Sequence, residues 1–66
     1  MKLAKYMEIE RLSDEEMGAM IGKDRTVVSR YRRGELVPPS DVIWEIQSKT
    51  NLAVQFNDWF SKGNAS

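Results

Sequence analysis

The side chains best suited to chemistry lie in one short segment near the middle of the chain, between positions 25 and 33. If this segment is helical, positions three and four apart fall on one face. That face carries only hydroxyl and guanidinium groups, at Thr26, Ser29, Arg30 and Arg33. Val28 and Tyr31 fall on the opposite face and suit a protein core. Guanidinium forks and hydroxyls can hydrogen-bond the edges of nucleobases, so the pattern predicts a helix that packs by one face and contacts a DNA major groove with the other.

Positive charge is concentrated in the same part of the chain, although the chain as a whole is neutral. Ten Lys and Arg residues balance ten Asp and Glu residues, which gives a formal net charge of +0. Five of the ten cationic residues fall between positions 23 and 33, where Asp24 is the only acid. Proteins that bind phosphate groups usually have an excess of basic residues, so the zero net charge argues against phosphate binding. The uneven distribution nevertheless predicts one cationic face on a neutral body.

The polar residues around this helix are expected to divide into two groups, because such a helix enters the groove by its N-terminal end. The residues expected to contact base edges are Arg25, Thr26, Ser29 and Arg30. The residues expected to contact phosphate are Ser13, Lys23, Arg32 and Arg33. Near Ser13, backbone amides at the start of the preceding helix are expected to donate hydrogen bonds to the phosphate. The alternative is a solvated face whose arginines pair with nearby acids, which does not explain the Ser and Thr in the same stripe.

Four segments with helical spacing are expected to position this face, and no stretch alternates strictly enough to predict more than a very short strand. The expected helices cover about residues 2 to 11, 14 to 21, 25 to 33 and 40 or 41 to 49, with a short final turn over 56 to 60. The expected fold is therefore an all-α, compact four- to five-helix domain. We expect residues 1–60 to form this single domain and 61–66 to be a polar, flexible tail.

The ends of the second and third helices are marked by capping residues. Ser13 and Glu16 have the spacing of a capping box, in which each side chain bonds the other residue's amide. Gly22 is suited to end that helix in the left-handed conformation, and Asp24 to begin the next. Gly34 is expected to close the third helix in the same way. Two helices joined by so short a turn must cross steeply, which predicts a helix-turn-helix.

Composition argues against several other classes of protein. The chain contains no cysteine and no histidine, so it lacks the usual ligands of structural zinc and the usual nucleophile and base pairs. Its acids cluster at expected helix starts, where capping explains them. No apolar run approaches the roughly 20 residues that cross a bilayer. We therefore expect a cytoplasmic protein that is not an enzyme. It is expected to bind no metal, cofactor, small-molecule substrate or membrane.

The segment from residue 12 to residue 34 resembles the helix-turn-helix of the lambda-repressor-like superfamily, and within it the small phage Cro-type repressors. The positions that carry the resemblance are Gly18, Gly22, Val28 and Arg33-Gly34. Similarity continues through Pro38, Asp41, Ile46, Thr50, Ala53-Val54 and Asn57-Asp58-Trp59. The resemblance implies a five-helix domain that represses transcription in a bacterial cell or infected host. It also implies binding to a pseudo-palindromic double-stranded operator, commonly as a homodimer.

Two residues depart from the pattern that the resemblance implies. The first residue of the second helix is commonly a glutamine that touches phosphate, and here it is Asp14, whose charge would be repelled. Gly18 stands where alanine is more common, which should cost the helix up to roughly 1 kcal/mol. Close approach of the third helix could compensate for that loss.

Aromatic residues near the end of the chain suggest a partner surface. Trp44 lies off the line of the apolar residues expected to face inward, and Trp59-Phe60 end the expected domain. Dimer contacts are therefore expected at Trp44, Trp59 and Phe60, although completion of the core by these rings explains them equally well.

Two other functions remain open on the same fold. The first is an antitoxin that binds its own promoter and a toxin, against which the short tail argues. The second is a protein-interaction module without DNA binding, which the zero net charge favours. A salt titration separates the second from a DNA-binding protein, because binding to phosphates weakens steeply as salt rises.

Overall fold

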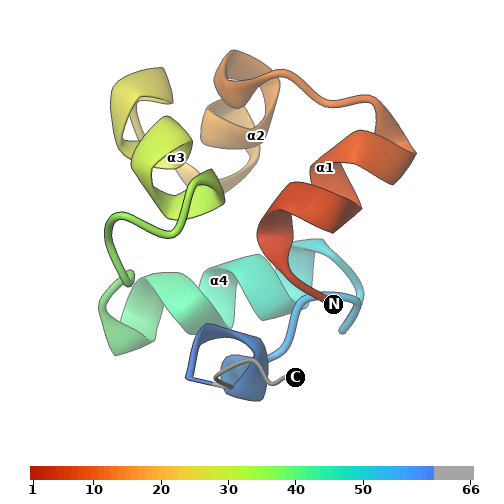
Figure 1. Ribbon diagram of the computed structural model, residues 1–66, viewed down its shortest axis with the longest axis vertical. Coiled ribbons are helices and arrows are strands. Elements are labelled where there is room, and N and C mark those ends of the chain that lie inside the picture. Colours follow the sequence, from red (N-terminus) through yellow and green to blue (C-terminus); the bar gives the residue numbers. More distant parts are fainter. Residues whose placement is uncertain (61–66) are drawn as a thin grey trace.

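The computed structural model describes residues 1–60, which form four α-helices and a short 3-10 helix (Figure 1). The elements in chain order are α1 (Leu3–Glu10), α2 (Asp14–Ile21), α3 (Arg25–Arg32), α4 (Ser40–Lys49) and the 3-10 helix η1 (Phe56–Trp59). No strand occurs in this part of the chain, which confirms the expected all-α class. None of these helices has the length and apolar character needed to span a membrane. The expected tail, 61–66, lies outside the described residues.

The hydrophobic core lies where the four α-helices meet. In Figure 1, α2 and α3 lie next to one another at the top, with α1 to their right and α4 beneath them. Every α-helix contributes at least two core side chains: Leu3, Met7, Met17, Ile21, Val28, Tyr31, Val42, Ile43 and Ile46, joined by Val54 from the segment after α4. Truncating one such side chain to alanine costs about 2 to 5 kcal/mol, a large share of the stability of a domain this small.

The start of α2 is fixed by the capping box that the sequence predicts. The Ser13 hydroxyl accepts a hydrogen bond from the Glu16 amide at 3.0 Å, and the Ser13 amide donates to Glu16 Oε1 at 2.8 Å. At the other end, Gly22 adopts a left-handed conformation with φ of 70°. The Lys23 amide then donates to the Gly18 carbonyl at 2.9 Å. Both limits of α2 therefore follow from local hydrogen bonding.

The limits of α3 are set in a similar way. Asp24 is its N-cap, with Oδ2 accepting from the Thr26 amide at 3.1 Å. Gly34 follows the helix with φ of 76°, and the Glu35 amide donates to the Arg30 carbonyl at 2.9 Å. Only residues 22 to 24 separate α3 from α2, so the two helices are held close together by a short, well-bonded turn.

Gly18 lies at the closest approach between α2 and the turn that follows it. A Cβ atom placed on Gly18 would overlap the carbonyl oxygen of Lys23, whereas the nearest atom of α3, Val28 Cγ2, would be at 3.5 Å. The second distance is an ordinary van der Waals contact. The sequence predicts that α3 approaches Gly18 closely, but the nearest part of the chain is the backbone of the turn. This backbone leaves no room for a Cβ atom at position 18, which explains why glycine is needed here.

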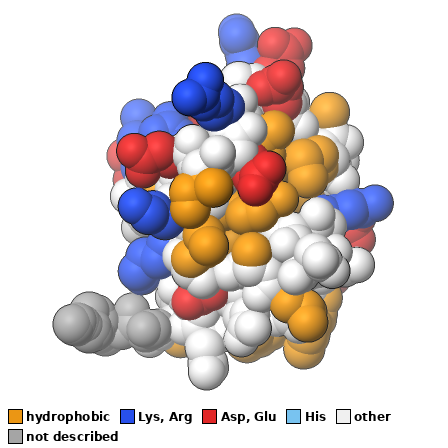
Figure 2. Space-filling view, turned by 90° about the vertical axis from the view of Figure 1, so that its right-hand side faces the viewer, with side chains coloured by type: hydrophobic (Ala, Val, Ile, Leu, Met, Phe, Trp, Pro, Cys, Tyr) orange, Lys and Arg blue, Asp and Glu red, His pale blue; other side chains and the backbone are white. Residues whose placement is uncertain are grey.

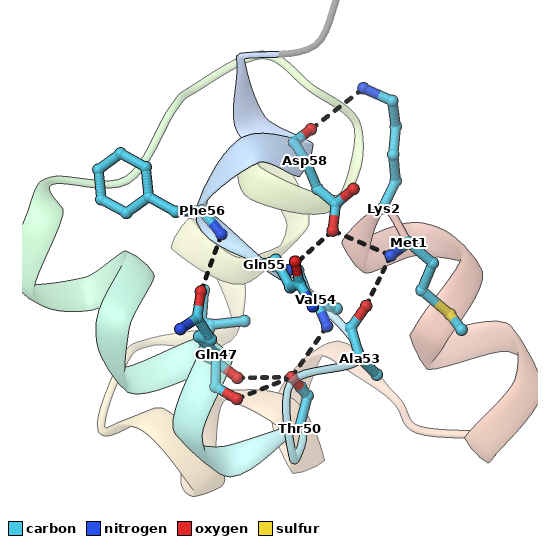
Figure 3. Close-up of polar contacts among 10 residues, drawn as sticks. Met1, Lys2, Gln47, Thr50, Ala53, Val54, Gln55, Phe56 and Asp58 are labelled. Atoms are coloured by element: carbon cyan, nitrogen blue, oxygen red, sulfur yellow. Dashed lines mark hydrogen bonds and ion pairs between the residues drawn. The ribbon is translucent and has the colours of Figure 1, made fainter.

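The segment after α4 is folded back onto that helix by side-chain hydrogen bonds (Figure 3). Thr50 Oγ1 donates to the Ile46 carbonyl at 2.7 Å and accepts from the Val54 amide at 3.1 Å. Gln47 Oε1 accepts from the Phe56 amide at 2.9 Å. These contacts place Val54 in the core and hold η1 beside α4.

The first residues of the chain are bonded to η1 (Figure 3). Asp58 Oδ2 accepts from the Met1 amino group at 2.9 Å and from the Gln55 amide at 2.7 Å. The Met1 amino group also donates to the Ala53 carbonyl at 2.6 Å, and Lys2 Nζ donates to the Asp58 carbonyl at 3.3 Å. Burial opposes ionisation of Asp58, but the Gln55 hydrogen bond and the nearby positive charges outweigh it and lower its pKa.

Candidate nucleic-acid interface

The outer face of α3 is open to solvent along the stripe of residues expected to contact bases. Arg25, Thr26 and Arg30 are exposed, whereas Ser29 is half-buried and its Oγ accepts a long hydrogen bond from Arg32 Nη2 at 3.4 Å. On the inner face Val28 is 0 % and Tyr31 is 5 % exposed. The helix therefore has the two chemically distinct faces that its sequence predicts.

Three of the cations in this region have no partner within residues 1–60. Lys23, Arg25 and Arg30 make no hydrogen bond or ion pair there. The neighbouring acid, Asp24, is occupied by its cap bond to the Thr26 amide. An external acceptor could bind these groups without first displacing an internal one.

Arg33 and Arg32 are both paired, but to different degrees. Arg33 Nη2 lies 3.4 Å from Glu35 Oε1, and both side chains are about half exposed, at 52 % and 55 %. A pair this open is worth roughly 0 to 1 kcal/mol, so a phosphate could compete for Arg33. Arg32 instead forms a fork with Asp14, through Nε to Oδ1 at 2.8 Å and Nη2 to Oδ2 at 3.0 Å.

The Arg32–Asp14 pair ties the end of α3 to the first residue of α2. The hydrogen bonds from Arg32 lower the pKa of Asp14, and the same bonds raise the pKa of Arg32. The acid that would repel a phosphate at the start of α2 is thus neutralised by a guanidinium. Arg32 is less available for phosphate than the sequence suggests, and its contact there stays a prediction.

Ser13 is also engaged within the chain. Its hydroxyl and its amide both belong to the capping box with Glu16. A phosphate at the start of α2 would therefore meet the next amides of the first turn rather than the Ser13 hydroxyl. Three acids, Asp14, Glu15 and Glu16, lie in that turn and make it a weak anion site. The expected phosphate contact at Ser13 stays a prediction.

The aromatic residues expected at a dimer contact lie in two different environments. Trp44 and Phe60 are exposed, at 54 % and 56 %. Trp59 packs against Tyr31 with ring centroids 6.2 Å apart and planes at 75°, and its buried Nε1 has no acceptor within residues 1–60. Phe56 lies between the two exposed rings, 5.3 Å from each. Sequence reasoning missed Phe56, although its four-residue spacing from Phe60 could have signalled the pair.

Comparison with known proteins gives no match to any protein-family model, any curated protein or any solved structure. The resemblance to lambda-repressor-like proteins therefore rests on the quoted residues of the chain. Within residues 1–60, no three acidic side chains gather closely enough to hold a metal ion, and the sequence has no histidine or cysteine to assist them. The candidate site is accordingly the outer face of α3 with the cations beside it.

Proposed function

We propose that this protein is a sequence-specific double-stranded DNA-binding regulator of transcription, with α2 and α3 as a helix-turn-helix and α3 as the recognition helix. The observation that carries the proposal is the state of the outer face of α3. Arg25 and Arg30 are exposed and unpaired within residues 1–60, while Val28 and Tyr31 anchor the same helix in the core. A rigid helix that presents free guanidinium groups is well suited to recognise base edges.

The chemistry of recognition follows from the placement of each side chain. An α-helix with its side chains is about 10 to 12 Å across and fits a major groove about 12 Å wide. Arg25 and Thr26, in the first turn of α3, would reach deepest when the helix enters by its N-terminal end. Arg30 could form two hydrogen bonds to O6 and N7 of a guanine, and Ser29 could bond either partner of a base pair.

Phosphate contacts would fix the register of this helix in the groove. Lys23, in the turn before α3, and Arg33, directly after it, are the cations best placed for that role. Arg32 would act mainly by holding α3 to α2 through Asp14, since its fork already uses two donors. The two phosphate-binding cations would thus flank the ends of the base-reading face.

A homodimer on DNA is part of the proposal because one module of this size covers only about 600 to 1,000 Å² of its surface on DNA. A single interface of that size rarely gives tight binding. Half-sites one helical turn apart are separated by about 34 Å. The protein measures 29 × 23 × 23 Å, so two copies fit side by side at that spacing. Occupying such an operator would exclude polymerase and repress transcription in the cytoplasm.

Selection of bound fragments from a random duplex pool tests the proposal. A sequence motif with twofold symmetry is the expected result. The selected duplex should then bind with an affinity that falls by about 0.9 logarithmic units per phosphate neutralised for each tenfold rise in salt. Recovery of no motif, together with binding that does not respond to salt, would refute the proposal and favour a protein-interaction module.

A charge-matched pair of variants makes the test specific to α3. Arg30→Ala removes a cation from the outer face of α3, and Lys5→Ala removes one from the exposed side of α1. Both change the net charge equally. Arg30→Ala should lower affinity for the selected duplex by roughly tenfold or more, whereas Lys5→Ala should have little effect. Equal losses would mean that only overall charge matters and that α3 does not read the bases.

A further inference from the structure

A narrow groove lies between four segments of the chain: the start of α1, the end of α3, the loop that follows α3, and η1. Its volume is about 250 Å³. Leu36 and Val37 form part of its wall and are 41 % and 48 % exposed, and Tyr31 and Trp59 add aromatic surface. Sites for drug-sized molecules measure about 300 to 1,000 Å³, so this groove would accept only one smaller molecule.

Positive charge exceeds negative charge around the groove. Among the residues that the structure describes, three cations and one acid line it: Lys2, Arg32, Arg33 and Asp58. The carboxylate of Asp58 is already engaged, because its Oδ2 accepts from the Gln55 amide at 2.7 Å. The charge of the lining therefore favours an anion as the occupant of the groove.

Two acids outside the lining, Asp14 and Glu35, neutralise the arginines to different degrees. Arg32 is held firmly by its two bonds to Asp14, at 2.8 and 3.0 Å. Arg33 is held weakly, with Nη2 at 3.4 Å from Glu35 Oε1 and both side chains about half exposed. A pair this open exchanges easily with an external carboxylate. Arg33 is thus the cation best placed to bind an anion in the groove.

Most of the polar side chains that line the groove can only donate hydrogen bonds, since ammonium, guanidinium and indole groups have no acceptor atom. One of these donors, Trp59 Nε1, is buried and has no acceptor within residues 1–60, which costs free energy. The end of α3 offers few free acceptors, because the amides of residues 33 to 35 already bond the carbonyls of residues 29 to 31. A ligand for this groove should therefore carry acceptors.

Apolar surface alone does not distinguish the groove from the rest of the molecule. Figure 2 looks onto the side that carries α1 and shows hydrophobic side chains gathered there among charged ones. A second, more open hollow next to α1 is lined by two acids, Glu8 and Asp14, and by one base, Arg32, so its charge does not favour an anion. The groove is different because it combines apolar walls, hydrogen-bond donors and an excess of positive charge.

We propose that this groove binds a small carboxylate with an apolar body, such as a single-ring aryl acid. The carboxylate would pair with the Arg33 guanidinium, whose planar fork matches its two oxygens. The apolar body would lie against Leu36, Val37 and Trp59. Inorganic phosphate has no apolar part to bury in such a site, and a neutral apolar molecule would leave the positive charge unmatched.

The consequence for DNA rests on the proposed function, but ligand binding does not. Arg33 is one of the two cations proposed to bind phosphate at the ends of the base-reading face. A carboxylate bound to Arg33 would compete with that phosphate, so the ligand would weaken binding to all duplexes alike. The molecule would thus act as an effector of the regulator. The two ideas can fail separately, because ligand binding is measured without DNA.

Titration of the full chain with phenylacetate, followed by the indole N–H signals in proton–nitrogen NMR spectra, tests the proposal. The Trp59 signal should move and saturate with a dissociation constant of about 0.1 to 1 millimolar. The signal of Trp44, which is exposed on α4 and does not line the groove, should stay in place. A spectrum of Trp44→Phe assigns the two signals.

Two further probes test the chemistry of the ligand. Phenylacetamide has the same shape without the charge and should bind at least about fivefold more weakly than phenylacetate. Inorganic phosphate has the charge without the apolar body and should bind more weakly still. The absence of a saturable shift up to about 10 millimolar phenylacetate would overturn the proposal. Equally tight binding of either of the other two probes would also overturn it.

Matched variants connect binding to the groove. Arg33→Gln should raise the dissociation constant of phenylacetate about fivefold, whereas Lys5→Gln removes the same charge from the exposed side of α1 and should not. Val37→Ser should weaken binding, whereas Ile9→Ser changes a similarly exposed apolar residue of α1 and should not. Substitutions at such surface positions usually leave the fold intact. Equal effects of a variant and its control would overturn the placement of the ligand.

The effect on DNA is measured with the selected duplex. Saturating phenylacetate should lower the affinity of the wild type for that duplex severalfold and leave the affinity of Arg33→Gln nearly unchanged. An unchanged affinity of the wild type would overturn the role of the ligand as an effector. A duplex that binds in a sequence-specific way but ignores phenylacetate would thus support the proposed function and contradict this consequence.

Discussion

Replacing Gly18 by alanine sets two effects of opposite sign against each other. Glycine within a helix is about 1 kcal/mol less favourable than alanine, because it loses more backbone freedom on folding. On propensity alone, Gly18→Ala should therefore stabilise α2. The resemblance to lambda-repressor-like proteins, where alanine is common at this position, leads to the same expectation.

The structure predicts the opposite result. The added Cβ would overlap the Lys23 carbonyl oxygen, which is backbone and has little freedom to move. The Lys23 amide is bonded to the Gly18 carbonyl at 2.9 Å, and Gly22 holds the turn in its left-handed conformation. Relief requires the whole turn to move away from α2. Overpacking of this kind costs about 1 to 3 kcal/mol, which equals or exceeds the gain in propensity of about 1 kcal/mol.

The net expectation for Gly18→Ala is a loss of stability of up to about 2 kcal/mol, or up to roughly 15 °C in Tm for a domain of this size. Thermal and urea unfolding followed by circular dichroism measure it. Ala19→Gly is the matched control, because Ala19 is the next residue of α2 and is exposed. It should lose about 1 kcal/mol from propensity alone. A Gly18→Ala protein more stable than the wild type by the full propensity gain of about 1 kcal/mol would refute the close approach of the turn.

The remaining predictions concern charge. Arg30→Ala should reduce the discrimination between particular base pairs by about 1 to 3 kcal/mol. Arg33→Ala should instead weaken binding to all duplexes alike and reduce the slope of log affinity against log salt by about one. Titrations on selected and random DNA measure both effects. Arg32→Ala should destabilise the free protein by at most about 1 kcal/mol, because its ion pair with Asp14 is partly exposed. Urea unfolding measures this loss, and an unchanged free energy of unfolding would mean that the pair does not stabilise the packing of α2 and α3. The pKa values of Asp14 and Asp58 are lowered in the folded state, so both stabilise the fold above about pH 4 and lose this effect as the pH falls through their folded pKa values. Asp58→Asn should therefore lose less stability on acidification than the wild type, and a parallel loss in both proteins would exclude Asp58.

The helix limits could be predicted from the sequence because their causes are local. The Ser13 and Glu16 pair and the Asp24 cap each act over three residues or fewer, and the structure confirms both. The two faces of α3 are equally local, since they follow from helical spacing alone. The exposure of Arg25 and Arg30 was thus within reach of pattern reasoning, whereas what they bind stays a prediction.

The features that could not be predicted join residues far apart in the chain. Arg32 and Asp14 are separated by 18 positions, and the Met1 amino group and Asp58 by 57. Neither pair has a spacing that a helix or turn would bring together, so the folded chain must be known first. The contact between Phe56 and Trp44 could not be predicted for the same reason, because Trp44 belongs to another helix.

The division of α3 into two faces also bears on how easily this protein could be retargeted. Val28 and Tyr31 keep the helix docked, and the outward side chains of Thr26 and Arg30 take no part in that packing. Substitutions at such solvent-facing positions usually alter stability by less than about 0.5 kcal/mol. If the protein binds DNA as proposed, its preference among duplexes could therefore change, by evolution or in a library, with little loss of the stability of this small domain.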